Sequence, residues 1–170
     1  VNGRPHLRVE NRVLPAGPTV VDMMANSAFY YGLLRALSDE DRPVWTKMSF
    51  AAAEHNFTAA AQHGTEAQLY WPGSGHVMPD ELVLRHLLPM ASEGLRRWGV
   101  ATEVSDRFLG VIEGRAKSGR NGSAWQVSTV HALQERGLAR PQALAEMLRL
   151  YCERMHGNEP VHTWDGPADG

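Results

Sequence analysis

The stretch Pro5–Val13 constrains the fold most, because apolar and charged residues alternate along it and a turn and a long apolar helix follow directly. Alternation with a period of two is typical of a β-strand, whose successive side chains point to opposite faces. One face of this strand would carry Leu7, Val9, Asn11 and Val13. The other face would carry His6, Arg8, Glu10 and Arg12.

The charged face places two guanidinium groups around one carboxylate. Arginine binds phosphates and carboxylates through two parallel hydrogen bonds, and glutamate oxygens are suitable ligands for magnesium. This face therefore suits an anionic ligand together with a divalent cation. The alternative is a ladder of surface ion pairs, since alternating charges are common on a solvated strand. The spacing alone leaves both interpretations open.

Leu14–Pro18 predicts a turn, after which a helix should run from Thr19 to Leu37. Thr19 is a suitable N-cap, and Asp22 lies at the third helical position, as in a capping box. The residues that would form a small-residue face are Val21, Ala25, Ala28, Gly32 and Ala36. We expect this helix to be buried nearly all round, beneath the sheet that holds the charged strand.

Together these segments resemble a known family. The matching residues are Arg8–Arg12, Leu14-Pro15, Pro18-Thr19, Asp22, Ala25-Asn26, Phe29–Leu33, Glu54–Phe57, Gly64, Gly119–Gln126 and Pro160–Trp164. They resemble the carboxylate–amine ligases of the glutamate–cysteine ligase type, most closely their second bacterial family. The strand is also distantly similar to the active-site strand of glutamine synthetase.

The resemblance implies an ATP-dependent ligase that uses Mg²⁺. ATP would activate a glutamate-like carboxylate as an acyl phosphate, and an amino acid or other amine would displace the phosphate. Glu10 would be the metal ligand, and Arg8 and Arg12 would be catalytic. The implied fold is α+β and mostly helical, with a few antiparallel strands forming part of a glutamine synthetase-like catalytic sheet.

Two further groups are candidate substrate- or nucleotide-binding residues. His55 and Asn56 belong to a polar patch in a predicted helix over Phe50–His63, which Gly64 should end. The resemblance places such a patch near the substrate, while a solvated helix face is an equal alternative. The second group is Arg115, Lys117, Arg120 and Asn121, within the stretch Arg115–Ser123. Cations and glycines before a helix suit an anion, although an exposed basic turn has the same composition.

The remaining pattern predicts mainly helices. Glu66–Trp71 should be a strand, and Pro72–His76 a flexible loop. A helix should begin near Pro79, be kinked or split near Leu88 by Pro89, and end at Trp98-Gly99. Further helices are expected over Ser105–Arg115, Ser123–Arg136 and Pro141–Gly157. The predicted inner stripe of the last is Leu144, Leu148, Tyr151 and Met155, and Val161 and Trp164 should attach the tail to the body.

Composition limits the class of protein. The 170 residues fit a single domain, with 43% hydrophobic residues and a net charge of −2. This charge indicates neither nucleic acid nor an anionic membrane as a partner. The single cysteine, Cys152, fits a reducing compartment, so a cytoplasmic location is expected. Because Val1 lies just before the charged strand, we expect either the C-terminal portion of a larger ligase or a homo-oligomer that supplies partner strands.

A second class of function stays open from the sequence. The chain could be a non-catalytic helical interaction or regulatory module that keeps the ligase-like strand only as structure. Carboxylates on partner strands would favour the enzyme, because a metal that bridges phosphates usually needs more than one protein ligand.

Overall fold

The computed structural model describes residues 5, 10, 14 and 16–165, which are mostly helical with one small antiparallel sheet. The coarse α+β prediction is therefore confirmed. The α-helices are α1 (Val20–Ser38), α2 (Phe50–His63), α3 (Pro79–Leu82), α4 (Leu88–Arg97), α5 (Thr102–Ser118), α6 (Gly122–Glu135) and α7 (Arg140–Gly157). The other elements are η1 (Val44–Thr46), η2 (Gly64–Glu66), β1 (Leu69–Trp71), β2 (Gly75–Val77), η3 (Val83–Leu87) and η4 (Val161–Thr163). The strand predicted over Pro5–Val13 falls almost entirely outside the described residues, so a glutamine synthetase-like sheet remains a prediction.

Helices α1 and α4 make the closest contact in the body of the protein. A Cβ added at Gly94 would lie 1.8 Å from the Gly32 carbonyl oxygen, and one added at Gly32 would lie 2.3 Å from the Ala91 carbonyl oxygen. A larger side chain at either glycine would therefore push the two backbones apart. The predicted small-residue face of α1 is confirmed, because Ala25, Gly32 and Ala36 are all buried.

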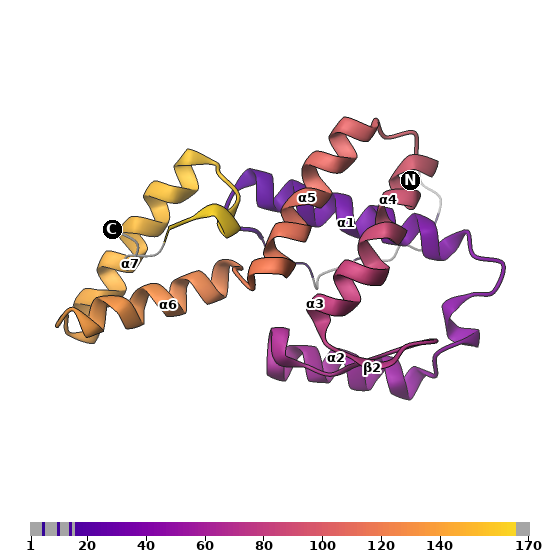
Figure 1. Cartoon of the computed structure of the whole chain (residues 1–170), viewed down its shortest axis with the longest axis horizontal. Coiled ribbons are helices and arrows are strands. Elements are labelled where there is room, and N and C mark those ends of the chain that lie inside the picture. The colour runs from indigo at the N-terminus through magenta and orange to yellow at the C-terminus, as the bar shows by residue number, and fades with distance from the viewer. Residues whose placement is uncertain (1–4, 6–9, 11–13, 15, 166–170) are drawn as a thin grey trace.

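Helix α5 crosses α1, lies beside α4 and completes this core (Figure 1). Val111 and Ile112 pack with Ala25 of α1, and Leu109 packs with Leu95 of α4. The helix is longer than predicted at both ends, since it runs from Thr102 to Ser118. The first part of the predicted Arg115–Ser123 loop is therefore helical.

The elements α3, η3 and α4 form one helical run that contains a wider turn. In η3 the Leu88 N–H donates to the Val83 carbonyl, five residues earlier, which is the π-helical pattern. Pro89 follows directly and has no N–H to donate to the carbonyl of Arg85. The wider turn relieves the clash between the proline ring and that carbonyl. The predicted kink or split near Leu88 takes the form of this π-turn, and the helical run continues through it.

Helices α6 and α7 lie side by side and extend away from α1, α4 and α5 (Figure 1). Val130, Leu133 and Ala143 form the core between them. The segment Asn158–Trp164, which we call the C-terminal strap, returns along this pair. Its Trp164 ring packs edge-on against Trp125, with 5.1 Å between the ring centroids.

The predicted attachment of the tail is confirmed, because Val161 and Trp164 are buried. The inner stripe predicted for α7 is confirmed at Tyr151, which packs against Trp125 and Trp164, and is wrong at Leu144, Leu148 and Met155. Leu144 and Leu148 are exposed, whereas Ala143 is buried and Met147 packs against the core. Adjacent stripes on one helix both have helical spacing, so only the position of α6 decides which one is inside.

Helix α2 has the predicted bounds, with Gly64 at its C-terminal end. The predicted strand over Glu66–Trp71 is shorter in the structure, since η2 takes Glu66 and β1 begins at Leu69. The predicted flexible loop is wrong in part, because β2 pairs with β1 in an antiparallel hairpin in which Leu69 faces Val77. Gly73 and Gly75 have positive φ angles of 84° and 74°, which allow a tight turn rather than a loose loop.

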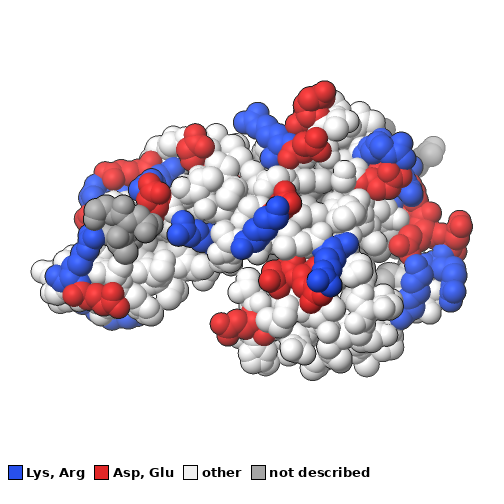
Figure 2. Space-filling model, viewed as in Figure 1, with Lys and Arg blue, Asp and Glu red and all other residues white. Residues whose placement is uncertain are grey.

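Charges of both signs are spread over the face seen in Figure 2, without a large patch of one sign. Across residues 16–165, no helix has both the length and the apolar character that crossing a membrane requires.

The prediction that α1 is buried nearly all round is wrong for the described structure. Val20, Met24, Tyr31 and Leu34 keep 47–59% of their surface exposed.

Candidate functional site

The predicted catalytic strand is only marginally described. Arg8 and Arg12 lie outside the described residues, and Glu10 is described and exposed. An exposed glutamate offers the hard oxygen donors that Mg²⁺ prefers, and Mg²⁺ often binds through one or two carboxylates plus substrate phosphates. Glu10 therefore fits a magnesium ligand chemically. Among the described residues, no group of three or more His, Cys, Asp or Glu side chains is arranged to hold a metal ion.

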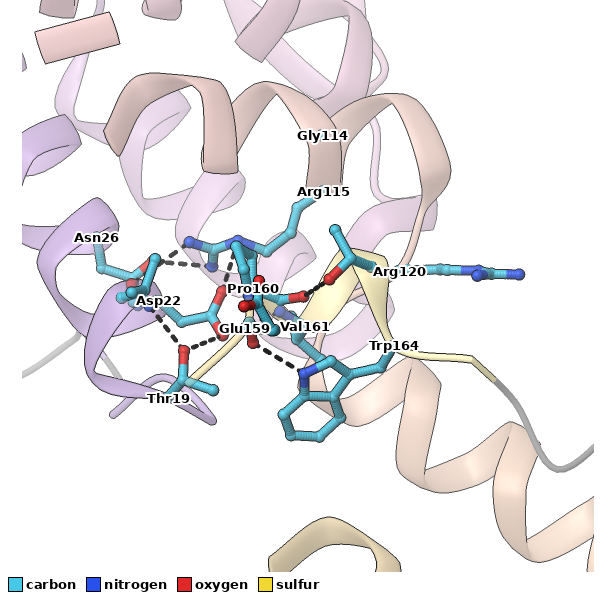
Figure 3. Close-up of polar contacts among 12 residues, drawn as sticks. Thr19, Asp22, Asn26, Gly114, Arg115, Arg120, Glu159, Pro160, Val161 and Trp164 are labelled. Atoms are coloured by element: carbon cyan, nitrogen blue, oxygen red, sulfur yellow. Dashed lines mark hydrogen bonds and ion pairs between the residues drawn. The ribbon is translucent and has the colours of Figure 1, made fainter. Parts of the chain in front are cut away.

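A buried polar cluster lies at the start of α1, a few residues after this strand (Figure 3). Asp22 is fully buried at its centre. Thr19 caps the helix by accepting the Asp22 N–H at 3.0 Å, and its own hydroxyl donates to Asp22 Oδ2 at 2.8 Å. The backbone N–H of Val161 donates to the same oxygen at 3.1 Å. The side chain of Asp22 thus joins the start of α1 to the C-terminal strap, 139 residues away.

Arg115 of α5 supplies the positive charge of the cluster. Its Nη1 donates to Asn26 Oδ1 at 2.9 Å, and its Nη2 donates to the Asp22 backbone carbonyl at 3.4 Å. Its Nε lies 3.7 Å from Asp22 Oδ1, which is within ion-pair reach and too long for a hydrogen bond. Arg115 was a predicted ligand-binding residue. In the structure it balances a buried carboxylate and joins α5 to α1.

Three buried side-chain atoms in this cluster have no hydrogen-bond partner among the described residues. They are Asp22 Oδ1, Arg115 Nε and His162 Nδ1. Burial lowers the pKa of Arg115, and the Asp22 carboxylate opposes this change. Burial also lowers the pKa of His162, while Asp22 raises it and Arg115 lowers it. His162 is therefore neutral at pH 7, because its ordinary pKa of about 6.5 is already below that pH.

The strap packs closely against Gly114 of α5 and is held by hydrogen bonds to backbone groups. The His162 ring lies over Gly114 of α5 so closely that an added Cβ would come within 2.3 Å of Nε2. Asn158 accepts the Val21 N–H at 3.2 Å through its side-chain oxygen. Trp164 donates from its indole nitrogen to the Glu159 carbonyl at 2.8 Å. The cluster is thus closed on one side by the strap.

The junction of α5 and α6 holds the other cations predicted to bind a ligand. Lys117 is exposed and pairs with Glu113 at 2.6 Å, and the Arg120 side chain points away from the cluster (Figure 3). Asn121 caps α6 by accepting the Ala124 N–H at 2.9 Å. These residues do not converge on one point. The sequence analysis did not identify Asn121 as a cap, although asparagine is one of the preferred N-cap residues.

A groove of about 470 Å³ nevertheless borders this junction, between α5 and the start of α3. The charged or amide side chains that line it are Asp80, Arg115, Lys117 and Asn121. The groove is thus of mixed charge. Both cations of α5 at the groove have partners, since Arg115 is paired with the buried Asp22 and Lys117 with the exposed Glu113.

Asn56 and His55 are the other two residues predicted to bind a ligand, and they differ in their surroundings. The Asn56 side chain accepts the Tyr70 N–H at 2.7 Å and donates to the Tyr70 carbonyl at 2.8 Å. The Asn56 side chain therefore joins α2 to the edge of the hairpin, and it satisfies the same backbone groups that a neighbouring strand would. His55 is exposed.

Comparisons with protein-family models, curated proteins and solved structures found no match to this chain. The site therefore rests on its own geometry. Sequence reasoning identified Thr19 and Asp22 only as a helix cap, and it did not identify His162 as part of the cluster. A signal was present, because Asp22 is the one charged residue from Thr19 to Leu34 in a helix predicted to be buried. A buried carboxylate requires a partner.

Proposed function

We propose that this chain is part of an ATP-dependent carboxylate–amine ligase of the glutamate–cysteine type, in which the buried cluster anchors a catalytic strand. In this proposal Glu10 binds magnesium, and Arg8 and Arg12 bind the transferred phosphoryl group and the acyl group. The γ-phosphoryl of ATP passes to a carboxylate oxygen and leaves ADP. An amine then attacks the acyl carbon and releases phosphate.

One observation supports the proposal most strongly. Segments that carry the resemblance but lie far apart in the sequence meet at the start of α1. Asp22 comes from the first segment, and Val161 and His162 come from the last. Pro18 packs against Gly122 of the middle segment, where an added Cβ would lie 2.8 Å from the proline ring. Three of the segments on which the resemblance rests thus contribute to one contact region at the start of α1.

Catalysis of this kind depends on fixed positions. Phosphoryl transfer requires charge neutralisation and alignment more than covalent chemistry by the protein. The helix that follows the strand is held at its first turn by Thr19, Arg115 and the strap. A strand leaving this point would have one rigid end, which is what a platform for Arg8, Glu10 and Arg12 needs.

The test is magnesium-dependent ATP turnover with glutamate and a panel of amines, in the protein at its full natural length. Glu10→Gln keeps the size of the side chain and removes its charge. We expect turnover to fall by at least about a hundredfold, as for the loss of one electrostatic stabiliser of a transition state. Glu159→Gln is the control, because it removes the charge of an exposed glutamate of the strap, whose contact with Trp164 is made by the backbone carbonyl and not by the side chain. Equal curves of turnover against magnesium for wild type and Glu10→Gln would contradict the role of Glu10.

A second candidate is the non-catalytic interaction or regulatory module. This candidate is favoured because three residues predicted to bind a ligand make structural contacts instead. They are Arg115, Asn121 and Asn56. The same assay separates the two. A protein that binds neither ATP nor glutamate by calorimetry, at its full natural length and with magnesium present, would support the module.

A further inference from the structure

The exposed face of α1 has the spacing of a helix–helix interface. Val20, Met24, Ser27, Tyr31 and Leu34 recur at intervals of four and three residues, which is the spacing of a heptad seam. We call these five residues the α1 seam. No other described element covers it, and the four large side chains are among the exposed large hydrophobic residues of the protein.

The seam lies beside an apolar groove of about 440 Å³ that runs between α1, the end of α4 and the start of α5. Trp98 and Val104 form the outer rim of this groove and are exposed, whereas Phe108 lies deeper. No charged side chain lines the groove. From Met23 to Leu34 the sequence has no charged residue either. Contiguous apolar surface of this kind is unusual on a monomer and marks an interaction site.

We propose that the α1 seam is the interface of a homodimer, in which two copies of α1 pack antiparallel across a twofold axis. The register follows from the helix itself. Helix α1 runs from Val20 to Ser38, so full overlap of two antiparallel copies places the axis at residue 29. Met24 then lies opposite Leu34 of the second copy, and Ser27 lies opposite Tyr31.

This register is complementary in shape. The large Tyr31 ring meets the small Ser27 side chain, and two flexible apolar side chains, Met24 and Leu34, meet each other. The Ser27 hydroxyl already donates to the Met23 carbonyl at 3.0 Å, so burying it leaves no unsatisfied donor. The arrangement repeats on both sides of the axis, as an isologous interface requires.

The available area agrees with a dimer of moderate affinity. The exposed fractions of the seam and of the Trp98–Val104 rim correspond to roughly 600 Å² per copy, which is the lower end of the range for specific interfaces. An interface of this size and apolar character is expected to show a monomer–dimer equilibrium that depends on concentration. A partner with a charged surface would fit less well, because burial of an unpaired charge is costly.

The first test is sedimentation equilibrium of the wild-type protein and two matched variants. Leu34→Glu places a carboxylate in each half of the seam, so we expect the dimer dissociation constant to rise at least about tenfold. Leu148→Glu is the control, since Leu148 is also an exposed leucine in a helix but lies on α7. It should leave the dissociation constant within about twofold. A wild-type protein that stays monomeric at every concentration, or equal effects of the two variants, would overturn the proposal.

The second test examines the register without adding charge. In a Cys152→Ser background, the double variant Met24→Cys/Leu34→Cys should form disulfide-linked dimers on mild oxidation. Either single variant should not, because its two cysteines would lie about 15 Å apart along the helix axis, beyond disulfide reach. Circular dichroism confirms that each variant is folded. Failure of the folded double variant to form linked dimers would overturn the proposed pairing. Protection of its cysteines in a monomer would show that another segment or protein covers the seam, which would also overturn it.

Discussion

Removing the charge of Asp22 should destabilise the protein strongly, because within residues 16–165 this carboxylate is the counter-charge of a largely buried guanidinium, that of Arg115. The Arg115 side chain is 17% exposed and Asp22 is fully buried, so solvent can compensate for the loss only in part. Breaking one partner of a buried ion pair typically costs about 3–5 kcal/mol. Asn in place of Asp keeps one oxygen to accept the hydrogen bonds from Thr19 and Val161, so the lower figure applies. We therefore expect Asp22→Asn to lower the free energy of unfolding by about 3 kcal/mol.

A loss of this size is large for a single domain, whose total stability is about 5–15 kcal/mol. For a chain of this length it corresponds to a fall in Tm of about 6–12 °C. Urea unfolding followed by tryptophan fluorescence gives the measurement, since Trp164 is a buried residue of the strap that Asp22 holds and Trp125 is buried against it. The same cluster predicts energetic coupling, so the double variant Asp22→Asn/Arg115→Met should cost less than the sum of the single variants by at least about 1 kcal/mol.

Lys117→Met is the matched control for Arg115→Met. Both remove a cation of α5 paired with a carboxylate, but the Lys117 pair is exposed and should contribute at most about 1 kcal/mol. An Asp22→Asn variant that loses less than about 1 kcal/mol would behave like a surface pair. Additive effects of Asp22→Asn and Arg115→Met would likewise refute the argument that the two groups act together.

Two further predictions follow from the contacts around α5 and α4. Burial lowers the pKa of His162, so the unfolded chain binds a proton at a higher pH than the folded protein does; stability should fall as the pH drops below about 6.5, and His162→Gln should reduce this slope in urea titrations at successive pH values. A slope unchanged by the substitution would mean that another group causes it. Gly94→Ala should lower the free energy of unfolding by at least about 2 kcal/mol because the new methyl group would meet the α1 backbone, whereas Gly110→Ala, which meets nothing within 4 Å, should stabilise by up to about 1 kcal/mol. Similar Tm values for the two alanine variants would contradict the close contact of α1 with α4.

The sequence by itself determined most of the local structure. The start of α1 follows from Thr19, whose hydroxyl caps it, and the end of α2 follows from Gly64. The break before α4 follows from Pro89. Each of these signals acts within about one helical turn, so it can be read without knowing what surrounds the helix. The bounds of the helices were therefore largely predictable. The predicted charged strand lies almost entirely outside the described residues.

Only the tertiary structure decided which faces are buried and which polar groups meet. Asp22 and Arg115 are 93 residues apart, and nothing local to either specifies the pairing. Helical spacing allowed several inner stripes for α7, and packing against α6 selected the one that contains Ala143 and Met147. The cations of the predicted ligand site were separated in the same way, because α5 extends to Ser118 and turns Arg115 inward and Lys117 outward. Burial depends on which elements come together in space, whereas the periodicity of the sequence is compatible with more than one buried face.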